Sequence, residues 1–178
     1  MKKLFVGVLC VALSLSVQGK EVNMTSPDGK YQFTLSDSGG QLHYSLTWNG
    51  KQTVKPSLLG INANVEWRDG VEIGTVDSSR KDTIWHPVYG ERSEIKDCYH
   101  AWKIVVNRQN GRDKLILDVR AYDEGIAFRY HFPGGQYLKI TDEYTEYTMP
   151  EGTKAYFTPK AQTPYSYLPL ENWPGESD

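Results

Sequence analysis

Apolar and polar residues alternate along much of the chain. Apolar side chains recur at every second position in three runs, at residues 31–35, 42–48 and 126–132. A period of two places alternate side chains on one face of a β-strand, so each run predicts a strand with one buried face. β-Branched and aromatic residues predict further strands at 103–108, 114–122 and 140–148.

Dipeptides that favour tight turns separate these runs, namely Asp28-Gly29, Asn49-Gly50, Asp69-Gly70 and Asn110-Gly111. They tolerate positive φ and close hairpins, so successive strands are expected to be antiparallel neighbours. No window after residue 19 shows the sustained three-and-four apolar spacing of a capped helix. About ten strands do not fit one open sheet comfortably, so we expect an all-β antiparallel sandwich, with a barrel as the second arrangement.

Residues 1–19 have the pattern of a secretory signal peptide. Lys2 and Lys3 are followed by an almost uninterrupted apolar run, Leu4–Val17, and then by small residues up to Gly19. The run is shorter than the ~20 residues that cross a bilayer. We therefore expect a secreted, periplasmic protein with no membrane segment after cleavage.

Cleavage would leave Cys98 as the sole cysteine, so no internal disulfide is expected to hold the mature domain. We expect Cys98 to be a partly buried small apolar residue. A catalytic thiol is disfavoured because His100 is its only neighbour able to activate it, and no third group orients that pair.

Composition narrows the function classes. The 178 residues are 39% hydrophobic, enough for the core of one domain. Twenty basic side chains against 22 acidic ones give a net charge of −2, which argues against a nucleic-acid partner. The 12 Tyr, 5 Trp and 5 Phe suit a β-rich protein that contacts sugars.

Motifs for several chemistries are missing from the sequence. The histidines at 43, 86, 100 and 131 have no metal-ligand spacing, and the acidic residues do not have the order of a calcium loop. No phosphate-binding glycine loop and no Gly-x-Ser-x-Gly motif occurs. We therefore assign no metal ligand and no catalytic residue in this chain.

An irregular polar stretch at 85–95 is the candidate sugar-contacting loop. Tyr89, Glu91 and Arg92 are the predicted substrate-binding residues, because phenol, carboxylate and guanidinium groups bind hydroxyls. The alternative is that Glu91 and Arg92 form an ordinary surface ion pair.

Other polar and aromatic side chains are weaker candidates for sugar contact. We expect Arg120, Asp123 and Glu124 to form a structural turn network between two strands. The tryptophans that could stack on a pyranose ring are expected to lie mostly in the core, and they are Trp48, Trp67, Trp85 and Trp102.

Prolines and aromatic residues are interleaved at 156–173. Proline removes strand donors, so we expect an extended segment, whose rings must cover another surface. The predicted organisation is a signal peptide at 1–19, a sandwich at 20–155, and an extended segment at 156–178 that leads to a missing remainder.

Five segments, taken in order, resemble the amino-terminal domain of glycoside hydrolase family 97. The two most specific segments are Pro87–Ile95 and Val119–Tyr130. The other three are weaker, and they lie at 26–30, 40–51 and 57–60.

The resemblance implies an exported α-glucosidase or α-galactosidase that degrades polysaccharides. In that family a galactose-mutarotase-like supersandwich precedes a (β/α)₈ catalytic barrel, and inverting members add calcium. The implied role of this chain is a non-catalytic domain without a cofactor, which packs on the missing barrel and shapes a pocket for an α-linked oligosaccharide.

Two alternatives remain open. A free-standing carbohydrate-binding sandwich would fold residues 156–178 back onto its own sheets. A mutarotase-like enzyme would need His86 or His100 close to Glu91 or Glu94 on one sheet face.

Overall fold

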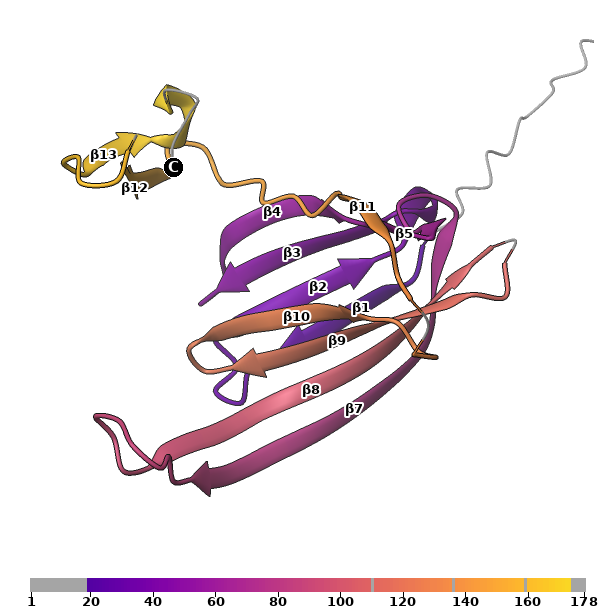
Figure 1. Ribbon diagram of the computed structural model, residues 1–178, viewed down its shortest axis with the longest axis horizontal. Helices are drawn as coiled ribbons and strands as arrows, with labels where there is room; N and C mark the ends of the chain where they lie inside the picture. Colours follow the sequence, from indigo (N-terminus) through magenta and orange to yellow (C-terminus); the bar gives the residue numbers. More distant parts are fainter. Residues whose placement is uncertain (1–18, 110, 136, 159, 174–178) are drawn as a thin grey trace, which may run out of the picture.

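The computed structural model describes residues 19–109, 111–135, 137–158 and 160–173. The predicted signal peptide, except Gly19, and Asn110 of one predicted turn lie outside the described residues. Two four-stranded antiparallel sheets face each other (Figure 1), which confirms the predicted sandwich and excludes the barrel. No described helix has the length and apolar character needed to cross a membrane.

The first sheet has the order β1-β2-β3-β4. Its strands are β1 (Glu21–Thr25), β2 (Tyr31–Ser36), β3 (Leu42–Trp48) and β4 (Lys51–Leu59). Between β3 and β4, Asn49 and Gly50 have φ of 49° and 74°, as the sequence predicts for a two-residue hairpin.

The second sheet has the order β10-β9-β8-β7. Its strands are β7 (Val71–Trp85), β8 (Ile95–Arg108), β9 (Lys114–Tyr122) and β10 (Gly125–His131). Every neighbouring pair in both sheets is antiparallel and consecutive along the chain, so short hairpins suffice to connect them.

Smaller elements complete the described chain. One three-stranded sheet contains β5 (Ile61–Ala63), β6 (Val65–Glu66) and β11 (Ile140–Glu143), and one hairpin contains β12 (Lys154–Phe157) and β13 (Ser166–Pro169). The two 3₁₀ turns are η1 (Ser38–Gly40) and η2 (Leu170–Asn172).

The core lies between the two main sheets. Alternate residues of β9 are inaccessible to solvent, and Leu115, Leu117 and Val119 each have 0% exposure. They face Phe33 and other apolar side chains of the first sheet in one continuous cluster. The alternation read from the sequence at 31–35, 42–48 and 126–132 therefore selects the inward face of β2, β3 and β10 correctly.

Two expectations need correction. The run 140–148 is a strand only at 140–143, and the following residues continue as an extended segment along β4. The segment 156–173 is not simply extended, since most of it lies within a β-hairpin and a 3₁₀ turn. The hairpin tolerates Pro169 because this residue is the last of β13. The ladder ends there, so the missing N–H breaks no hydrogen bond in its middle.

We predict that Leu117→Ala lowers the free energy of unfolding by about 2–5 kcal/mol, because it leaves a cavity in a close-packed core. Urea denaturation of residues 20–178 measures the loss. Ile116→Ala is the matched control, since the neighbouring side chain points to the outer face and is only half-buried. Equal losses in the two variants would contradict the assignment of the inner face.

Candidate functional site

The β7–β8 hairpin extends beyond the sandwich as a two-stranded arm, residues 82–98 (Figure 1). The third strand, β9, pairs with β8 only as far as Tyr99, opposite Tyr122. Beyond that point β7 and β8 pair with each other alone, up to Trp85 opposite Ile95. Two-stranded ribbons are marginally stable by themselves, so the arm depends on its base and on whatever it contacts.

Tyr99 holds the base of the arm. Its ring is 8% exposed and packs against Tyr122, with 5.0 Å between ring centroids. The guanidinium of Arg120 lies 4.6 Å from the centre of the same ring, a favourable cation–π arrangement. Beside it, Lys81 Nζ forms an ion pair of 2.7 Å with Asp97, and this hydrogen bond raises the pKa of Lys81.

The predicted substrate-binding residues lie in the loop at the tip of the arm. Tyr89, Glu91 and Arg92 are all exposed, and Tyr89 is 90% accessible. The side-chain contact that the structure shows in this loop joins His86 and Glu94, not Glu91 and Arg92. The tip therefore presents a phenol, a carboxylate and a guanidinium to solvent, and their role in binding sugar stays a prediction.

The pair of His86 and Glu94 meets one requirement of the mutarotase-like alternative, since Nε2 and Oε1 are 3.2 Å apart. Both side chains, however, are about two-thirds exposed. They flank a loop tip instead of sharing one sheet face, and an acid–base pair needs a positioned substrate. We therefore assign this pair no catalytic role.

The tryptophans divide between core and surface. Trp67 is 2% exposed, and Trp102 packs against the core cluster. Trp48 and Trp85 are about half exposed, so these two retain a ring face for contact with another molecule. Cys98 is half-buried with a free thiol, in agreement with the sequence-based expectation.

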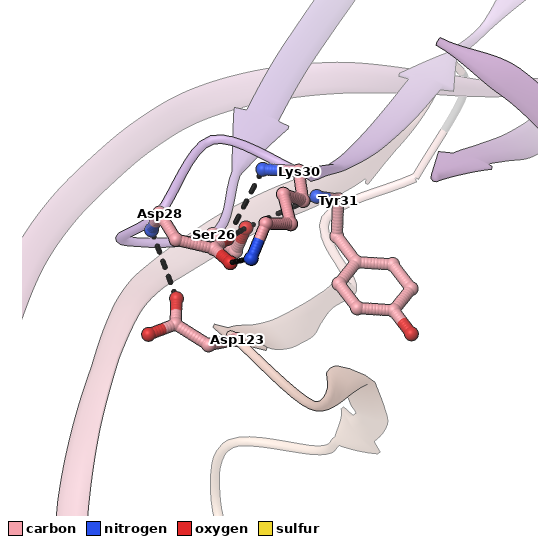
Figure 2. A network of polar contacts seen from close by, with 5 residues as sticks. All are labelled: Ser26, Asp28, Lys30, Tyr31 and Asp123. Atoms are coloured by element: carbon pink, nitrogen blue, oxygen red, sulfur yellow. Dashed lines mark hydrogen bonds and ion pairs between the residues drawn. The ribbon is translucent and has the colours of Figure 1, made fainter. Parts of the chain in front are cut away.

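A polar network joins the turn before β2 to the turn before β10 (Figure 2). Asp28 Oδ1 accepts hydrogen bonds from Ser26 Oγ at 2.6 Å and from the Lys30 amide at 3.0 Å, and Lys30 Nζ lies 2.9 Å from the other carboxylate oxygen. The Asp28 amide in turn donates to Asp123 Oδ1 at 2.8 Å. The network therefore links the two sheets at one end of the sandwich.

The location of this network differs from the sequence-based expectation. Asp123 does not join Arg120 and Glu124 in a network within its own hairpin; instead, its Oδ1 accepts a hydrogen bond from the Asp28 amide of the opposite sheet. Arg120 lies over Tyr99 and donates to the hydroxyl of Tyr122 at 3.4 Å, while Glu124 is exposed. Backbone pattern alone does not specify which turns meet across two sheets.

A polar hollow of about 630 Å³ lies on the outer face of the second sheet. Asp118 Oδ2 accepts a hydrogen bond from Arg129 Nε at 2.9 Å, and His131 Nδ1 lies 3.6 Å from the same oxygen. No motif in the sequence points to these residues as a pair. The short Asp123-Glu124 turn sets a register in which 118 faces 129, and that register is the signal that would have found the pair.

The β12–β13 hairpin carries a second exposed aromatic surface. Tyr156 and Tyr167 stack with 4.5 Å between ring centroids, yet they are 71% and 53% exposed. Figure 1 shows this hairpin set apart from both main sheets, at the end of an extended connection. Its rings therefore do not cover the sandwich from which they extend.

Comparison with known proteins identifies the family. The model of the glycosyl-hydrolase 97 N-terminal family matches residues 24–177. The chain belongs to this family. The retaining alpha-galactosidase of Bacteroides thetaiotaomicron is 30% identical over 159 residues, which cover 87% of this chain and 23% of that protein.

Solved structures show the same fold for this family 97 domain. A family 97 enzyme from Pseudoalteromonas sp. strain K8, in complex with panose, superposes with a TM-score of 0.77 at 23% identity, covering 85% of this chain and 25% of that one. A beta-arabinopyranosidase gives a TM-score of 0.72 at 25% identity, covering 79% of this chain and 23% of the enzyme. The domain thus spans about a quarter of the length of these relatives.

We predict that Asp28→Asn destabilises the family 97 domain in a pH-dependent way. Hydrogen bonds from Ser26 and Lys30 hold the pKa of the Asp28 carboxyl far below its ordinary value of 3.8. A lowered pKa in the folded state stabilises that state above the ordinary value, and the gain is lost as the pH falls toward the folded-state value. The urea midpoint should therefore drop at pH 7, and the difference should shrink below pH 3.8.

Asp82→Asn is the control, because Asp82 lies in the exposed arm and its nearest cation, Arg80, is 3.8 Å away. Urea midpoints measured from pH 7 down to acid conditions should show little change for this variant. An Asp28→Asn effect of constant size across that range would show that the carboxylate's charge is not what the network stabilises.

Proposed function

We propose that the chain is the non-catalytic amino-terminal domain of a secreted α-glycoside hydrolase, and that it packs on a catalytic barrel and shapes the carbohydrate pocket. The observation that carries the proposal is apolar surface left exposed on two projecting elements of a family 97 domain. The arm and the β12–β13 hairpin both lie toward one end of the molecule's long axis (Figure 1). Exposed apolar surface of this kind marks an interaction site.

The arm offers contacts of two kinds. Ile84, Trp85 and Val88 are 58%, 50% and 97% exposed, which suits packing against another domain. Tyr89 and Arg92 in the same loop supply groups that bind hydroxyls. Because barrel active sites are built from loops at one face, an arm docked beside that face would place its tip at the rim of the pocket.

The relatives support an α-linked oligosaccharide as the ligand class. One is named a retaining alpha-galactosidase, and two structures of a family 97 enzyme contain panose or acarbose. In the proposed protein the catalytic groups, and calcium where it is used, belong to the barrel. The described residues include no group of three His, Cys, Asp or Glu side chains arranged to hold a metal ion. We therefore propose no calcium ligand among them.

The free-standing binding module is less well supported. It requires the proline-rich segment to fold back on its own sheets. Within residues 156–158 and 160–173, Tyr156, Tyr165 and Tyr167 remain more than half exposed. These rings are left for contact with something outside the sandwich.

We predict that purified residues 20–178 hydrolyse neither nitrophenyl α-glucoside nor nitrophenyl α-galactoside, and that they give no heat with panose in titration calorimetry. Absorbance at the nitrophenolate band measures turnover. Hydrolysis would contradict a non-catalytic role, and micromolar binding of panose would favour the free-standing module.

A chimera tests the role of the loop. Residues 20–178 replace the matched segment of the retaining alpha-galactosidase, and hydrolysis of nitrophenyl α-galactoside is measured. We expect alanine at Tyr89, Glu91 or Arg92 to lower kcat/KM about fivefold, mainly by raising KM, because each variant loses a hydrogen bond worth ~1 kcal/mol.

Tyr137→Ala is the matched control, since Tyr137 is 87% exposed but lies in another loop. Thermal unfolding of each chimera separates loss of folding from loss of activity. A folded, active chimera that is indifferent to all three loop variants would contradict the proposed pocket residues, and a folded but inactive chimera would contradict the docking role.

A further inference from the structure

The carboxylate of Asp37 joins three segments of the chain at the start of the sandwich. Its Oδ1 accepts a hydrogen bond of 2.6 Å from the backbone nitrogen of Lys20, the residue before β1. Its Oδ2 accepts a hydrogen bond of 2.7 Å from the Ile73 amide of β7. The Asp37 amide in turn donates to the Lys20 carbonyl at 3.2 Å. The turn after β2 thereby holds the start of β1 against the second sheet.

Both hydrogen bonds to this carboxylate come from backbone amides. Among the described residues, no Lys, Arg or His side chain forms an ion pair with Asp37. The Lys20 side chain is engaged elsewhere, since its Nζ donates to the Gly74 carbonyl. A carboxylate binds a charged donor more strongly than a neutral amide. The Lys20 backbone nitrogen would therefore bind Asp37 more strongly as an ammonium than as an amide.

A hollow of about 420 Å³ surrounds this contact. The titratable groups among its lining residues are the carboxylates of Asp37 and Glu72 and the side chain of Lys20. Two negative groups against one positive group favour a further positive charge in the hollow. The open space also lets water bind the two additional N–H groups that an ammonium has and an amide lacks.

Gly19 lies tightly against the same turn. A Cβ at this position would come within 2.7 Å of both Asp37 Oδ1 and the Ser38 amide nitrogen, closer than Cβ atoms approach such groups. A larger residue here would push the Lys20 nitrogen away from Asp37. Gly19 is also the small residue that ends the predicted signal peptide, where small residues mark the cleavage site.

We propose that signal peptidase cuts between Gly19 and Lys20, and that the new α-ammonium group of Lys20 forms an ion pair with Asp37. One water hydrolyses the Gly19–Lys20 amide, which leaves a carboxylate on the released leader and an ammonium on Lys20. No other co-reactant is needed. The inference rests on the proposed function in one respect, that the chain is secreted.

The position of the cut decides whether the pair forms. The Lys20 nitrogen already lies 2.6 Å from Asp37 Oδ1, close to the ~2.7–2.9 Å of a charged N–H···O bond, so cleavage needs no rearrangement. A cut before Gly19 would leave a neutral amide at Lys20. A cut after Lys20 would remove the nitrogen altogether.

The first test determines the N-terminus. The chain 1–178 is produced with its own leader in a bacterium that has a periplasm, and the periplasmic product is analysed by intact mass and N-terminal sequencing. We expect Lys20 as the first residue. Any other first residue would overturn the proposal. A product that keeps Met1 would also contradict secretion in the proposed function, whereas a cut at another residue would not, so the two failures can be told apart.

The second test removes the charge of the new N-terminus. Nα-Acetylation of the processed protein keeps an N–H on Lys20 but makes it neutral, and peptide mass mapping locates the single acetyl group. We expect acetylation to raise the equilibrium constant of unfolding about fivefold in urea denaturation at pH 6.5 and low salt, because the ion pair is lost. No change on acetylation would overturn the proposal.

Variants of two carboxylates show which one senses the charge. In Asp37→Asn, acetylation should change the equilibrium constant of unfolding less than twofold. Glu21→Gln is the matched control, because Glu21 is the neighbouring carboxylate and its Oε1 accepts a hydrogen bond from Asn23 instead. Acetylation should still act about fivefold in that variant. An equal effect with and without the Asp37 carboxylate would overturn the ion pair.

A pH series gives a readout that does not depend on the folding of Asp37→Asn. An α-amino group ordinarily has a pKa of about 8, and pairing with a carboxylate raises this pKa in the folded state. The resulting stabilisation is complete below about pH 8 and is lost as the pH rises through the folded-state value. The stability difference between unmodified and acetylated protein should therefore shrink steadily above about pH 8. A constant difference would overturn the proposal.

Discussion

The mutual covering of two apolar sheet faces holds this domain together, and the unequal width of the two sheets determines what remains uncovered. Removal of apolar surface from water is the dominant favourable contribution to folding. It is complete at β9, where Leu117 and Val119 have 0% exposure, and incomplete at β10, where Phe128 is half-buried. This difference leaves an apolar groove of about 680 Å³ beside β10, lined among others by Ile126, Phe128 and Tyr130.

Polar contacts at the ends of the strands set the position of one layer over the other. Hydrophobic contact is not directional, so it does not by itself fix that position. The Asp28 amide bonds to Asp123 across the layers, and His100 Nδ1 lies 2.9 Å from the Thr25 carbonyl. These two contacts lie at one end of the sandwich, the end from which the arm projects (Figure 1). At the start of β7, the Ile73 amide donates to Asp37 Oδ2 of the first layer at 2.7 Å.

Two elements of the fold lack a covering layer. The arm pairs only within itself beyond Tyr99, and the β12–β13 hairpin pairs only within itself. Both carry exposed aromatic rings, such as Tyr89 and Tyr156. These two elements leave aromatic surface available for contact with further polypeptide. This agrees with a family 97 domain that spans about a quarter of the length of its relatives.

The alternating pattern by itself determined the strands at 31–35, 42–48 and 126–132 and the inward face of each, because the direction of each side chain in a strand depends on the local backbone. The turn dipeptides indicated that neighbouring strands are antiparallel. The polar residue types at 85–95 indicated the loop of the arm, and with it the predicted residues Tyr89, Glu91 and Arg92. Only the tertiary structure decided that Asp123 meets Asp28, that His86 meets Glu94, and that 144–148 extends the first layer. Such contacts depend on how far each sheet extends over the other, a long-range property that no single stretch of sequence encodes.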